Sequence, residues 1–441
     1  MAKGAKNESV DIDKLLEAGD QLAKEENWDK AIAAYSRALE INPRHGFAYF
    51  KRGSAYLAME DWDKALGDLN NSIMLSSDFS FAHFKRGIAY AELKYYKKSV
   101  IDFTKAIEIN KDFVFAYYRR GYSFYVLRQY QDAINDFDVA IQYNPTYCQA
   151  FFYRANSYFE IKKLEEAIAD YTKVLQLDPD HEKAYLSRGI AHGALGKNNE
   201  AIRDYTSAID LDPDSIIAYN FRGLLYAKLK RYSEAIKDFE KVISDNPNNI
   251  EAFNNLGIAY FATKNFEKSV ESYNNAIRLK PDAMNLYYNR ANAKFHNKNY
   301  LEAAKDYEQV LEIKPDFSQA YLGLANSHTA LEMYKEAFKD YTRAIAINPN
   351  FFQAYLGRAN VYMKMKYYKK AQEDFTLALE INPDFAQAYL NRGIAFKNDG
   401  KIREAVDDFN DFLRLQKGRD STAVQVRAWI KKLNYLPDEG V

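Results

Sequence analysis

The chain has 441 residues, and its 61 basic side chains (Lys and Arg) are matched by 61 acidic ones (Asp and Glu). This balance removes the positive field that sequence-independent binding of nucleic acid needs, so nucleic acid is disfavoured as a partner. A single cysteine, Cys148, excludes an internal disulfide framework, and packing is its expected role. No run approaches the ~18 apolar residues of a membrane span, and the first twelve residues lack a signal-peptide core, so we expect a cytoplasmic protein without a membrane span.

A period of 34 residues organises the chain from residue 12 onward. The pattern Arg-Gly-x-Ala-Tyr at 52–56 has similar counterparts at 86–90 and 120–124. Such a period indicates stacked structural units rather than separate globular domains. Residues 1–11 precede the first unit, and we expect them to be disordered. The predicted repeats, numbered one to twelve, are 12–45, 46–79, 80–113, 114–147, 148–181, 182–215, 216–249, 250–283, 284–317, 318–351, 352–385 and 386–419.

Each repeat carries two helical stripes when its positions are numbered as places 1 to 34. Apolar residues at places 4, 8 and 11 fall on one stripe, and those at places 17, 20, 24, 27 and 28 fall on another. Place 8 is Gly or Ala, place 20 is Ala or Ser, and place 24 is mostly Tyr or Phe. Proline at place 32, as in Pro43 and Pro145, cannot continue a helix and marks the turn between units. Each repeat is therefore predicted to be a helical hairpin.

The C-terminal residues 420–435 continue the helical pattern without the repeat. Val426, Trp429, Ile430 and Leu433 have helical spacing behind an Asp-Ser-Thr cap signal. We expect a capping helix that covers the open apolar face of the last hairpin, as repeat arrays require. Residues 436–441 form a short tail.

The 34-residue pattern closely resembles the tetratricopeptide repeat, and the resemblance covers residues 12–419. It implies an all-α fold, namely a right-handed α-solenoid (superhelix) of twelve helix-turn-helix units, to which the capping helix is added. It also implies a role in protein recognition. The first helix of each unit would line a concave groove, with places 2, 5, 6, 9, 12 and 13 facing that groove.

An Arg at place 7 and an Asp at place 23 occur together in most repeats. Both are missing from repeats one and eight, and only repeat ten separates them, with Leu324 and Asp340. This joint occurrence predicts pairing within one repeat, as a bidentate ion pair that clamps the hairpin rather than as acid–base catalysis. The predicted pairs are Arg52/Asp68, Arg86/Asp102, Arg120/Asp136, Arg154/Asp170, Arg188/Asp204, Arg222/Asp238, Arg290/Asp306, Arg358/Asp374 and Arg392/Asp408.

Aromatic residues fill many of the groove places in repeats two to five. An exposed strip of so many rings would exceed the usual apolar patch and would indicate an interaction surface. The alternative is contact between neighbouring first helices. The residues are Phe47, Phe50, Phe81, Phe84, Phe115, Tyr118, Tyr122, Tyr125, Phe152, Tyr153 and Phe159.

Asparagines take over the groove places from repeat eight onward. An amide offers a donor and an acceptor, so a file of Asn could pair with the backbone of an extended peptide, as in an asparagine ladder of some members of the family. The alternative is that these residues serve contacts between helices. The residues are Asn254, Asn255, Asn289, Asn292, Asn326, Asn360 and Asn391, and Asn156 in repeat five is an earlier instance.

The sequence contains no Gly-rich phosphate loop and no paired histidines at metal-ligand spacing. We therefore expect no catalytic, cofactor-binding or metal-binding residues, and a protein that is not an enzyme. The favoured function is a scaffold or adaptor that binds an extended peptide or a partner protein in the groove. Two alternatives remain open: a self-associating, homo-oligomeric array, or a helical-repeat RNA-binding protein, since Lys51, Lys85 and Arg119 at place 6 lie beside the rings.

Overall fold

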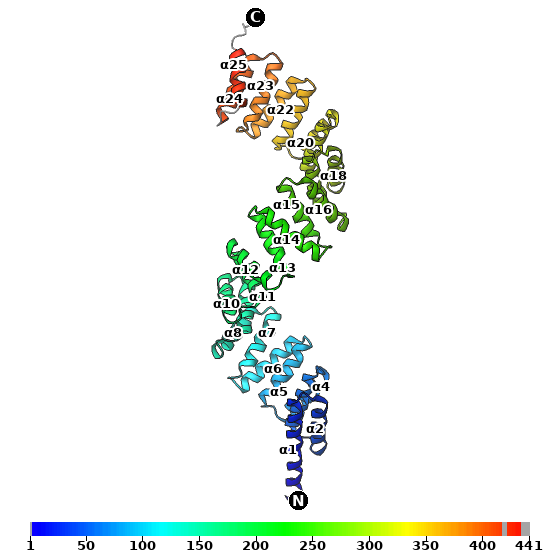
Figure 1. The fold of residues 1–441 in the computed structure, drawn as a ribbon, viewed down its shortest axis with the longest axis vertical. Coiled ribbons are helices and arrows are strands. Elements are labelled where there is room, and N and C mark those ends of the chain that lie inside the picture. Colours follow the sequence, from blue (N-terminus) through cyan, green and yellow to red (C-terminus); the bar gives the residue numbers. More distant parts are fainter. Residues whose placement is uncertain (1, 417–420, 434–441) are drawn as a thin grey trace. The chain divides into compact units, whose positions relative to one another are not determined.

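The computed structural model describes residues 2–416 and 421–433, and all regular elements in these ranges are helices. The chain forms two compact units, Met1–Phe221 and Arg222–Val441. Figure 1 shows the helices following one another along the chain. In chain order they are α1 (Ala2–Lys24), α2 (Trp28–Ile41), α3 (Gly46–Ala58), α4 (Trp62–Leu75), α5 (Ser80–Glu92), α6 (Tyr96–Ile109), α7 (Val114–Val126), α8 (Tyr130–Tyr143), α9 (Cys148–Glu160), α10 (Leu164–Leu177), α11 (Glu182–Ala194), α12 (Asn198–Leu211), α13 (Ile216–Lys228), α14 (Tyr232–Asp245), α15 (Ile250–Ala262), α16 (Phe266–Leu279), α17 (Met284–His296), α18 (Tyr300–Ile313), α19 (Ser318–Ala330), α20 (Tyr334–Ile347), α21 (Phe352–Lys364), α22 (Tyr368–Ile381), α23 (Ala386–Asn398), α24 (Ile402–Leu415) and α25 (Ser421–Leu433).

Each predicted repeat contains a first and a second helix, so the expectation of an all-α array of helical hairpins is confirmed. In repeat three, for example, α5 packs on α6, and α6 packs in turn on α7 of the next repeat. The same neighbour contacts recur inside both units. None of the described helices combines the length and the apolar character needed to cross a lipid bilayer.

A residue in the left-handed region ends the first helix of every hairpin, at place 15. Ten of these twelve residues are not glycine, with φ between 57° and 65°, and the other two are Gly196 and Gly400. The amide of the following residue reaches back into the helix, as in the bond from Tyr95 N to Tyr90 O at 2.7 Å. This is the hydrogen-bonding pattern of a helix C-cap, which usually takes glycine because other residues are strained there.

This strain gives a testable prediction for the turn of repeat nine. Lys298 has a φ of 63°, and Lys298→Gly should raise the free energy of unfolding by about 1 kcal/mol because glycine adopts this conformation without strain. Gly400→Lys, at the same place of repeat twelve, should lower it by a similar amount. Thermal melts of the two variants check the prediction, and shifts of the same sign in both would contradict it.

The core of each hairpin joins a large residue at place 24 to a small residue at place 8. The large residue is Leu69 in repeat two and a Tyr or Phe ring in the other repeats. In repeat three, Phe103 is fully buried, and a Cβ added to Gly87 would lie 2.7 Å from its Cε1 atom. The first helix can therefore approach the ring closely only because place 8 is small. This packing is the physical reason for the small and large places in the repeat pattern.

The two ends of the chain differ in how they match the sequence expectation. Helix α25 begins at Ser421 and packs its buried Val426 against the last hairpin, with the ring of Trp429 5.7 Å from that of Phe409. At the other end, α1 begins at Ala2, so the prediction of a disordered segment is wrong for residues 2–11. This stretch contains no proline, and nothing in it stops the helix from extending upstream. The predicted tail, 436–441, lies outside the described residues.

Candidate functional site

The Arg and Asp of one repeat form the predicted bidentate pair, which we call the Arg–Asp clamp. In repeat four, Arg120 donates from Nε to Asp136 Oδ2 at 2.8 Å and from Nη2 to Oδ1 at 2.7 Å. The side chains are 17% and 7% exposed. Burial raises the pKa of Asp136, and the two bonds from Arg120 oppose this shift. The same clamp is present in Arg52/Asp68, Arg86/Asp102, Arg154/Asp170, Arg188/Asp204, Arg222/Asp238, Arg290/Asp306, Arg358/Asp374 and Arg392/Asp408.

The clamp of repeat three differs from the simple predicted pair at Asp102. Its carboxylate accepts the two bonds from Arg86, at 2.8 and 2.6 Å, but its Oδ1 also lies 3.3 Å from His83 Nδ1. His83 replaces the usual Tyr at place 4, and its Nε2 lies 3.1 Å from the carbonyl oxygen of Ser77. The predicted pair of Arg86 and Asp102 is therefore present, and the histidine is a third member of this clamp.

The aspartate of the clamp also packs between the two helices of its hairpin, as Asp68 of repeat two illustrates. This carboxylate accepts from Nε and Nη2 of Arg52 at 2.7 and 2.8 Å. Its Cβ also belongs to the close contact between α3 and α4, since a Cβ added to Gly53 would lie 3.2 Å from it. The predicted pair of Arg52 and Asp68 is therefore present, and its aspartate has a packing role as well. The same close contact recurs at Asp136, Asp204, Asp238 and Asp408.

A third hydrogen bond of the clamp reaches the preceding repeat. Nη1 of Arg120 donates to Thr104 Oγ1 at 3.1 Å, and Nη1 of Arg86 donates to Asn70 Oδ1 at 2.8 Å. These acceptors stand at place 25, which the sequence reasoning did not single out. The clamp thus stabilises the contact between repeats as well as the hairpin itself.

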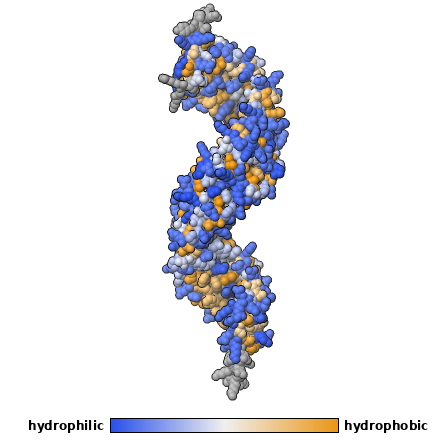
Figure 2. Space-filling view, in the orientation of Figure 1, coloured by the Kyte–Doolittle hydropathy of each residue, from blue (hydrophilic) through white to orange (hydrophobic). Residues whose placement is uncertain are grey.

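The aromatic strip divides into three structural groups. Phe47, Phe81 and Phe115, at place 2 of α3, α5 and α7, are 45%, 48% and 61% exposed. Figure 2 shows a hydrophobic area on the surface of the first unit in this part of the chain. These three rings are the part of the predicted strip that is open to a partner.

The rings at place 5 instead pack on an aromatic residue at place 34 of the same repeat. The ring centroids of Phe50 and Phe79 are 4.7 Å apart, and those of Phe84 and Phe113 are 4.6 Å apart. Tyr118 with Tyr147 and Phe152 with His181 repeat this contact at 4.7 and 4.9 Å. The four rings at place 5 are half-buried and therefore do not belong to an exposed strip. The place 34 rings are partners that the sequence reasoning missed.

The remaining rings of the strip belong to a cluster between repeats four and five. Tyr122 and Tyr125 lie 4.9 and 5.6 Å from Tyr153, measured between ring centroids. Phe159 packs against the small core of repeat five that contains Tyr171. All are half-buried, so contact between neighbouring helices explains them.

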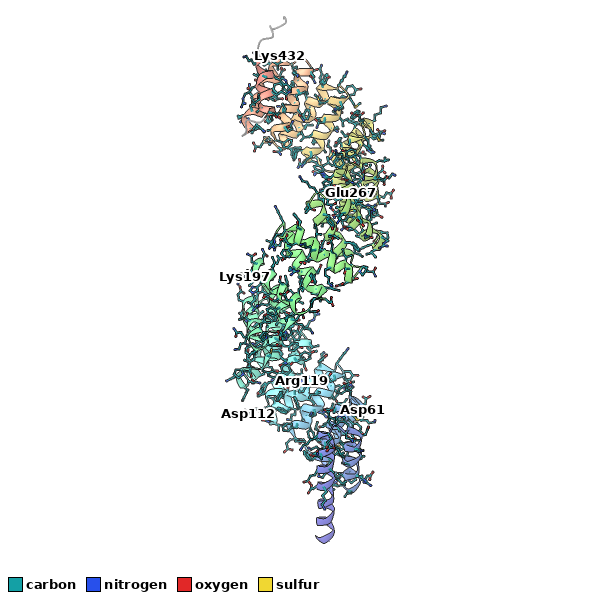
Figure 3. All side chains as sticks on the ribbon, in the orientation of Figure 1. Asp61, Asp112, Arg119, Lys197, Glu267 and Lys432 are labelled. Atoms are coloured by element: carbon teal, nitrogen blue, oxygen red, sulfur yellow. The ribbon has the colours of Figure 1, made fainter. Side chains whose placement is uncertain are left out.

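Three basic side chains at place 6 accompany the exposed rings. Lys51 pairs with Asp20 at 2.9 Å, and Arg119, labelled in Figure 3, lies 3.9 Å from Glu92. For Lys85, no carboxylate among the described residues lies within ion-pair distance. Burial and the nearby Arg119 lower the pKa of Lys85. Lys85 therefore offers an uncompensated ammonium group beside the rings.

Three of the four asparagines at place 9 bond to the tyrosine at place 24 of their own hairpin. Asn326 Oδ1 accepts from the hydroxyl of Tyr341 at 2.7 Å, and Asn156 and Asn292 accept from Tyr171 and Tyr307 in the same way at 2.6 Å. These three thus serve the helix contact that was the alternative to peptide binding. Asn254 and Asn360 accept from Asn289 and Asn391, both at 3.3 Å, and Asn255 is half-buried.

The bond in repeat ten can be tested by removing one hydroxyl group. Burial raises the pKa of Tyr341 to about 12, so its hydroxyl remains a donor. Tyr341→Phe should destabilise by about 1 kcal/mol because Asn326 loses that donor. Repeat eleven already has the combination that this variant creates, with Phe375 at place 24 and Asn360 at place 9. A thermal melt of Tyr341→Phe that equals the wild type would argue against a structural role for Asn326.

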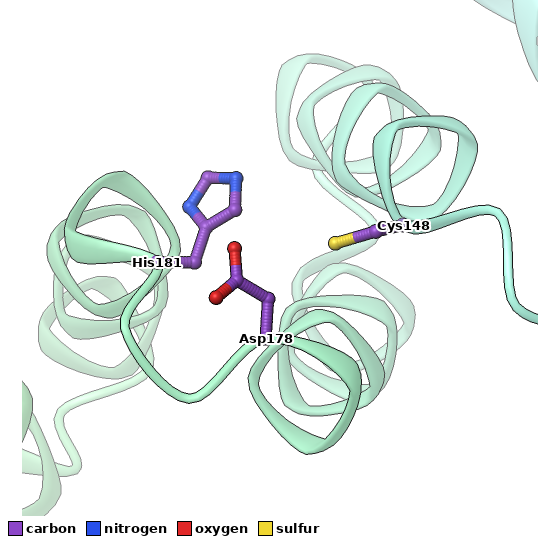
Figure 4. A group of neighbouring side chains, drawn as sticks. All are labelled: Cys148, Asp178 and His181. Atoms are coloured by element: carbon purple, nitrogen blue, oxygen red, sulfur yellow. The ribbon is translucent and has the colours of Figure 1, made fainter.

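Cys148, Asp178 and His181 form a cluster that the sequence reasoning did not foresee. Figure 4 shows them at the start of α9 and in the loop between α10 and α11, and their potential ligand atoms all lie within 4.8 Å of one another. His181 Nδ1, however, accepts the amide of Ala184 at 3.1 Å as the cap of α11. Burial raises the pKa of the Cys148 thiol. Helix capping and packing therefore account for these side chains.

Models of the tetratricopeptide repeat match this chain over most of its length. A "TPR repeat" model matches residues 19–60, 155–196, 193–230, 223–264 and 259–298, and "Tetratricopeptide repeat" models match 82–113, 114–147, 285–317, 318–351 and 352–385. The clamps and stacked hairpins define a helical-repeat protein of the solenoid class. More specifically, the chain belongs to the tetratricopeptide repeat family.

Several solved structures are similar to this chain at low sequence identity. YrrB, described as a TPR protein with an unusual peptide-binding site, is 23% identical over 44% of this chain and 97% of its own, with a TM-score of 0.40. Yeast Tom70 is 16% identical over 96% of this chain and 95% of its own, with a TM-score of 0.38. The TPR domain of P58(IPK) is 20% identical over 89% and 99%, with a TM-score of 0.32. No curated protein sequence matches the chain.

Proposed function

We propose that the protein is a scaffold or adaptor that binds an extended segment of a partner protein along the first helices of repeats two to four. The observation that supports this most directly is the exposure of Phe47, Phe81 and Phe115 at one place of three consecutive first helices. Large apolar rings gain free energy when a partner covers them. Their regular recurrence from repeat to repeat suits an extended chain that inserts successive apolar side chains between them.

The charge beside the rings favours a partner segment with acidic residues. Lys85 has no carboxylate partner among the described residues, and Arg119 is only loosely paired at 3.9 Å. A carboxylate from the partner would compensate the half-buried ammonium group of Lys85, whose lowered pKa reflects its burial. The expected ligand therefore combines apolar and acidic side chains.

The proposal also includes the groove asparagines of repeats nine and ten. The tyrosine hydroxyls occupy Oδ1 of Asn292 and Asn326, so the amide nitrogen atoms are the groups left to donate. We propose that they donate to backbone carbonyl groups of an extended ligand. We further propose a non-enzymatic role, since the Asp residues that recur at place 23 are engaged in Arg–Asp clamps. A cytoplasmic location is part of the same proposal.

The experiment is affinity capture of the partner from a lysate of the source cells. Phe47→Ala, Phe81→Ala and Phe115→Ala are combined in one variant, which leaves the place 5 rings in position. The variant should lose the partner while keeping its helical circular dichroism, because hot-spot aromatics contribute about 2 kcal/mol or more each to binding.

The control carries Met74→Ala and Ile101→Ala, on the second helices α4 and α6. Both side chains are more exposed than the three phenylalanines, at 77% and 68%. The control should retain the partner. Equal capture by the triple variant and the wild type would contradict the proposal. Self-association, the second candidate for an exposed apolar strip, predicts instead that the molecular mass of the pure protein rises with concentration and that the triple variant abolishes this rise.

A further inference from the structure

In several Arg–Asp clamps, among them those of Arg120, Arg154 and Arg392, the guanidinium lies near two aromatic rings of its own helix. Arg120 lies 5.7 Å from the ring centroid of Tyr117 at place 4 and 5.8 Å from that of Phe124 at place 11. Arg392 lies 5.5 and 5.9 Å from Tyr389 and Phe396 at the same places. An arginine is thus held by two rings, a carboxylate at place 23 and a polar group at place 25 of the preceding repeat.

Repeat eight keeps the surroundings of this arginine but lacks the arginine itself. Place 7 is Leu256 and place 23 is Ser272, whereas Phe253 and Tyr260 keep the rings at places 4 and 11. The structure has a cavity of about 330 Å³ at this position, between α14, α15 and α16. We call it the repeat-eight pocket. Its lining residues are Glu240, Ile243, Ser244, Phe253, Leu256, Tyr260, Lys268, Glu271, Ser272 and Asn275.

The two other repeats without the arginine do not offer the same opportunity. In repeat ten, Nδ1 of His328 lies 2.7 Å from Oδ2 of Asp340. The carboxylate at place 23 therefore already has a partner within this protein. In repeat one, places 4 and 11 are Leu15 and Leu22, so the two rings are missing. Among the described repeats, repeat eight alone combines the missing arginine, both rings and a cavity at the clamp position.

Two carboxylates replace the missing Asp of the clamp. Glu240 stands at place 25, where other repeats accept the third hydrogen bond of the arginine, and the hydroxyl of Tyr260 donates to it. Glu271 lines the pocket from α16. Planar guanidinium groups pair with carboxylates through directed hydrogen bonds, and they also stack on aromatic rings. The repeat-eight pocket therefore has the chemical groups that an arginine side chain requires.

The lysine in the pocket does not obstruct this use. Lys268 Nζ lies 5.3 Å from the ring centroid of Tyr260. Lys98 lies at the same distance from Tyr90 in repeat three, where Arg86 occupies its clamp. A lysine over this ring is thus compatible with an arginine at the clamp position.

We propose that the repeat-eight pocket binds the guanidinium group of an arginine side chain supplied by a partner polypeptide. The rings of Phe253 and Tyr260 would lie beside the guanidinium, and Glu240 and Glu271 would accept its hydrogen bonds. The pocket lies wholly within the second unit, and the proposal is independent of the groove in repeats two to four.

The test uses the full chain and a pair of short peptides that differ in one group. The first is Gly-Gly-Arg-Gly-Gly, and the second replaces arginine by citrulline, which has the same shape without the charge. Binding is followed by the methyl NMR signals of Ile243 and Leu256. The arginine peptide should shift both signals saturably. The citrulline peptide should bind at least about tenfold more weakly, which corresponds to a difference of at least about 1.4 kcal/mol. Equal binding, or no saturable shift with arginine, would overturn the proposal.

Two variants separate binding in the pocket from binding elsewhere. Leu256→Arg with Ser272→Asp rebuilds the Arg–Asp clamp, so it should fill the pocket, raise the melting temperature and abolish the response of Ile243 to the peptide. Glu240→Gln keeps an acceptor for Tyr260 but removes one charge, so it should weaken binding of the arginine peptide. An undiminished response in the rebuilt-clamp variant, or an unchanged affinity in Glu240→Gln, would count against the pocket as the arginine site.

Discussion

Asp136→Ala is expected to destabilise repeat four by about 3–5 kcal/mol, because it leaves the buried Arg120 guanidinium without its carboxylate. The estimate for a buried pair applies since Asp136 is only 7% exposed on its side chain. Repeats contact only their neighbours, so the loss should appear first as local opening. Hydrogen exchange of the amides in 114–147, together with a thermal melt, measures it.

The matched control replaces both partners of the clamp. Arg120→Leu with Asp136→Ser copies Leu256 and Ser272 of repeat eight, where the hairpin persists without a clamp. Removing both charges leaves no unpaired buried ion. The loss of stability in the double variant should therefore be at most about half of that in Asp136→Ala. A single-variant loss below about 1 kcal/mol, the range of exposed ion pairs, would show that the clamp is not energetically buried.

Phe137→Ala should have a comparably large effect, at about 3–5 kcal/mol, because it leaves a cavity in the core of repeat four. The ring is fully buried, and a Cβ on Gly121 would lie 2.9 Å from its Cε1 atom. Its loss removes contact with the rings of Tyr118 and Tyr153. Equilibrium unfolding in urea, followed by circular dichroism, measures the change.

Phe115→Ala provides the control within the same repeat and for the same residue type. Phe115 is 61% exposed, and its truncation should change stability by about 0.5 kcal/mol or less. This control also matters for the groove variant, which contains the same substitution. If Phe115→Ala and Phe137→Ala lowered the free energy of unfolding by similar amounts, the assignment of Phe115 to the groove surface and of Phe137 to the core would be contradicted.

Most of the fold follows from the spacing of apolar residues. The period of 34 predicts the hairpins, and the joint presence and absence of Arg and Asp predicts the clamp within one repeat. Both features are local, because all the residues that form a hairpin or a clamp pair belong to the same repeat. The helical start of the chain at Ala2 was missed, because a polar stretch without a stop signal is compatible with either state.

The detail of individual clamps was less predictable than their existence. Asp68 and Asp102 occupy the same place in neighbouring repeats, so the pattern assigns them the same role. The structure instead adds His83, whose Nδ1 lies 3.3 Å from Oδ1 of Asp102, to the clamp of repeat three. Place 4 and place 23 lie on different helices, so a histidine at place 4 reaches the aspartate only once the hairpin is folded. The periodicity of the sequence does not show this contact.

Contacts between repeats and across the hairpin loops were also harder to predict than the helical pattern. The bond from Arg120 to Thr104 and the ring pair of Tyr118 and Tyr147 depend on how one hairpin is placed against the next. Periodicity shows which residues face inward but not which neighbour they meet. The division of the aromatic strip into exposed place 2 and packed place 5 therefore required the structure.

The repeat-eight pocket combines both kinds of information. The loss of Arg and Asp at Leu256 and Ser272 is visible in the sequence as a break in a regular pattern. That this break leaves a cavity beside Glu240 becomes visible only when α14, α15 and α16 are placed together.

Site-specific photocrosslinking tests most directly whether the exposed rings of repeats two to four contact the partner. A benzophenone amino acid is placed at Phe81 in one variant and at Ile101, which is 68% exposed on α6, in another. Irradiation should link the captured partner to position 81 and not to position 101. Crosslinking at position 101 alone, or equally at both positions, would contradict the groove as the binding surface.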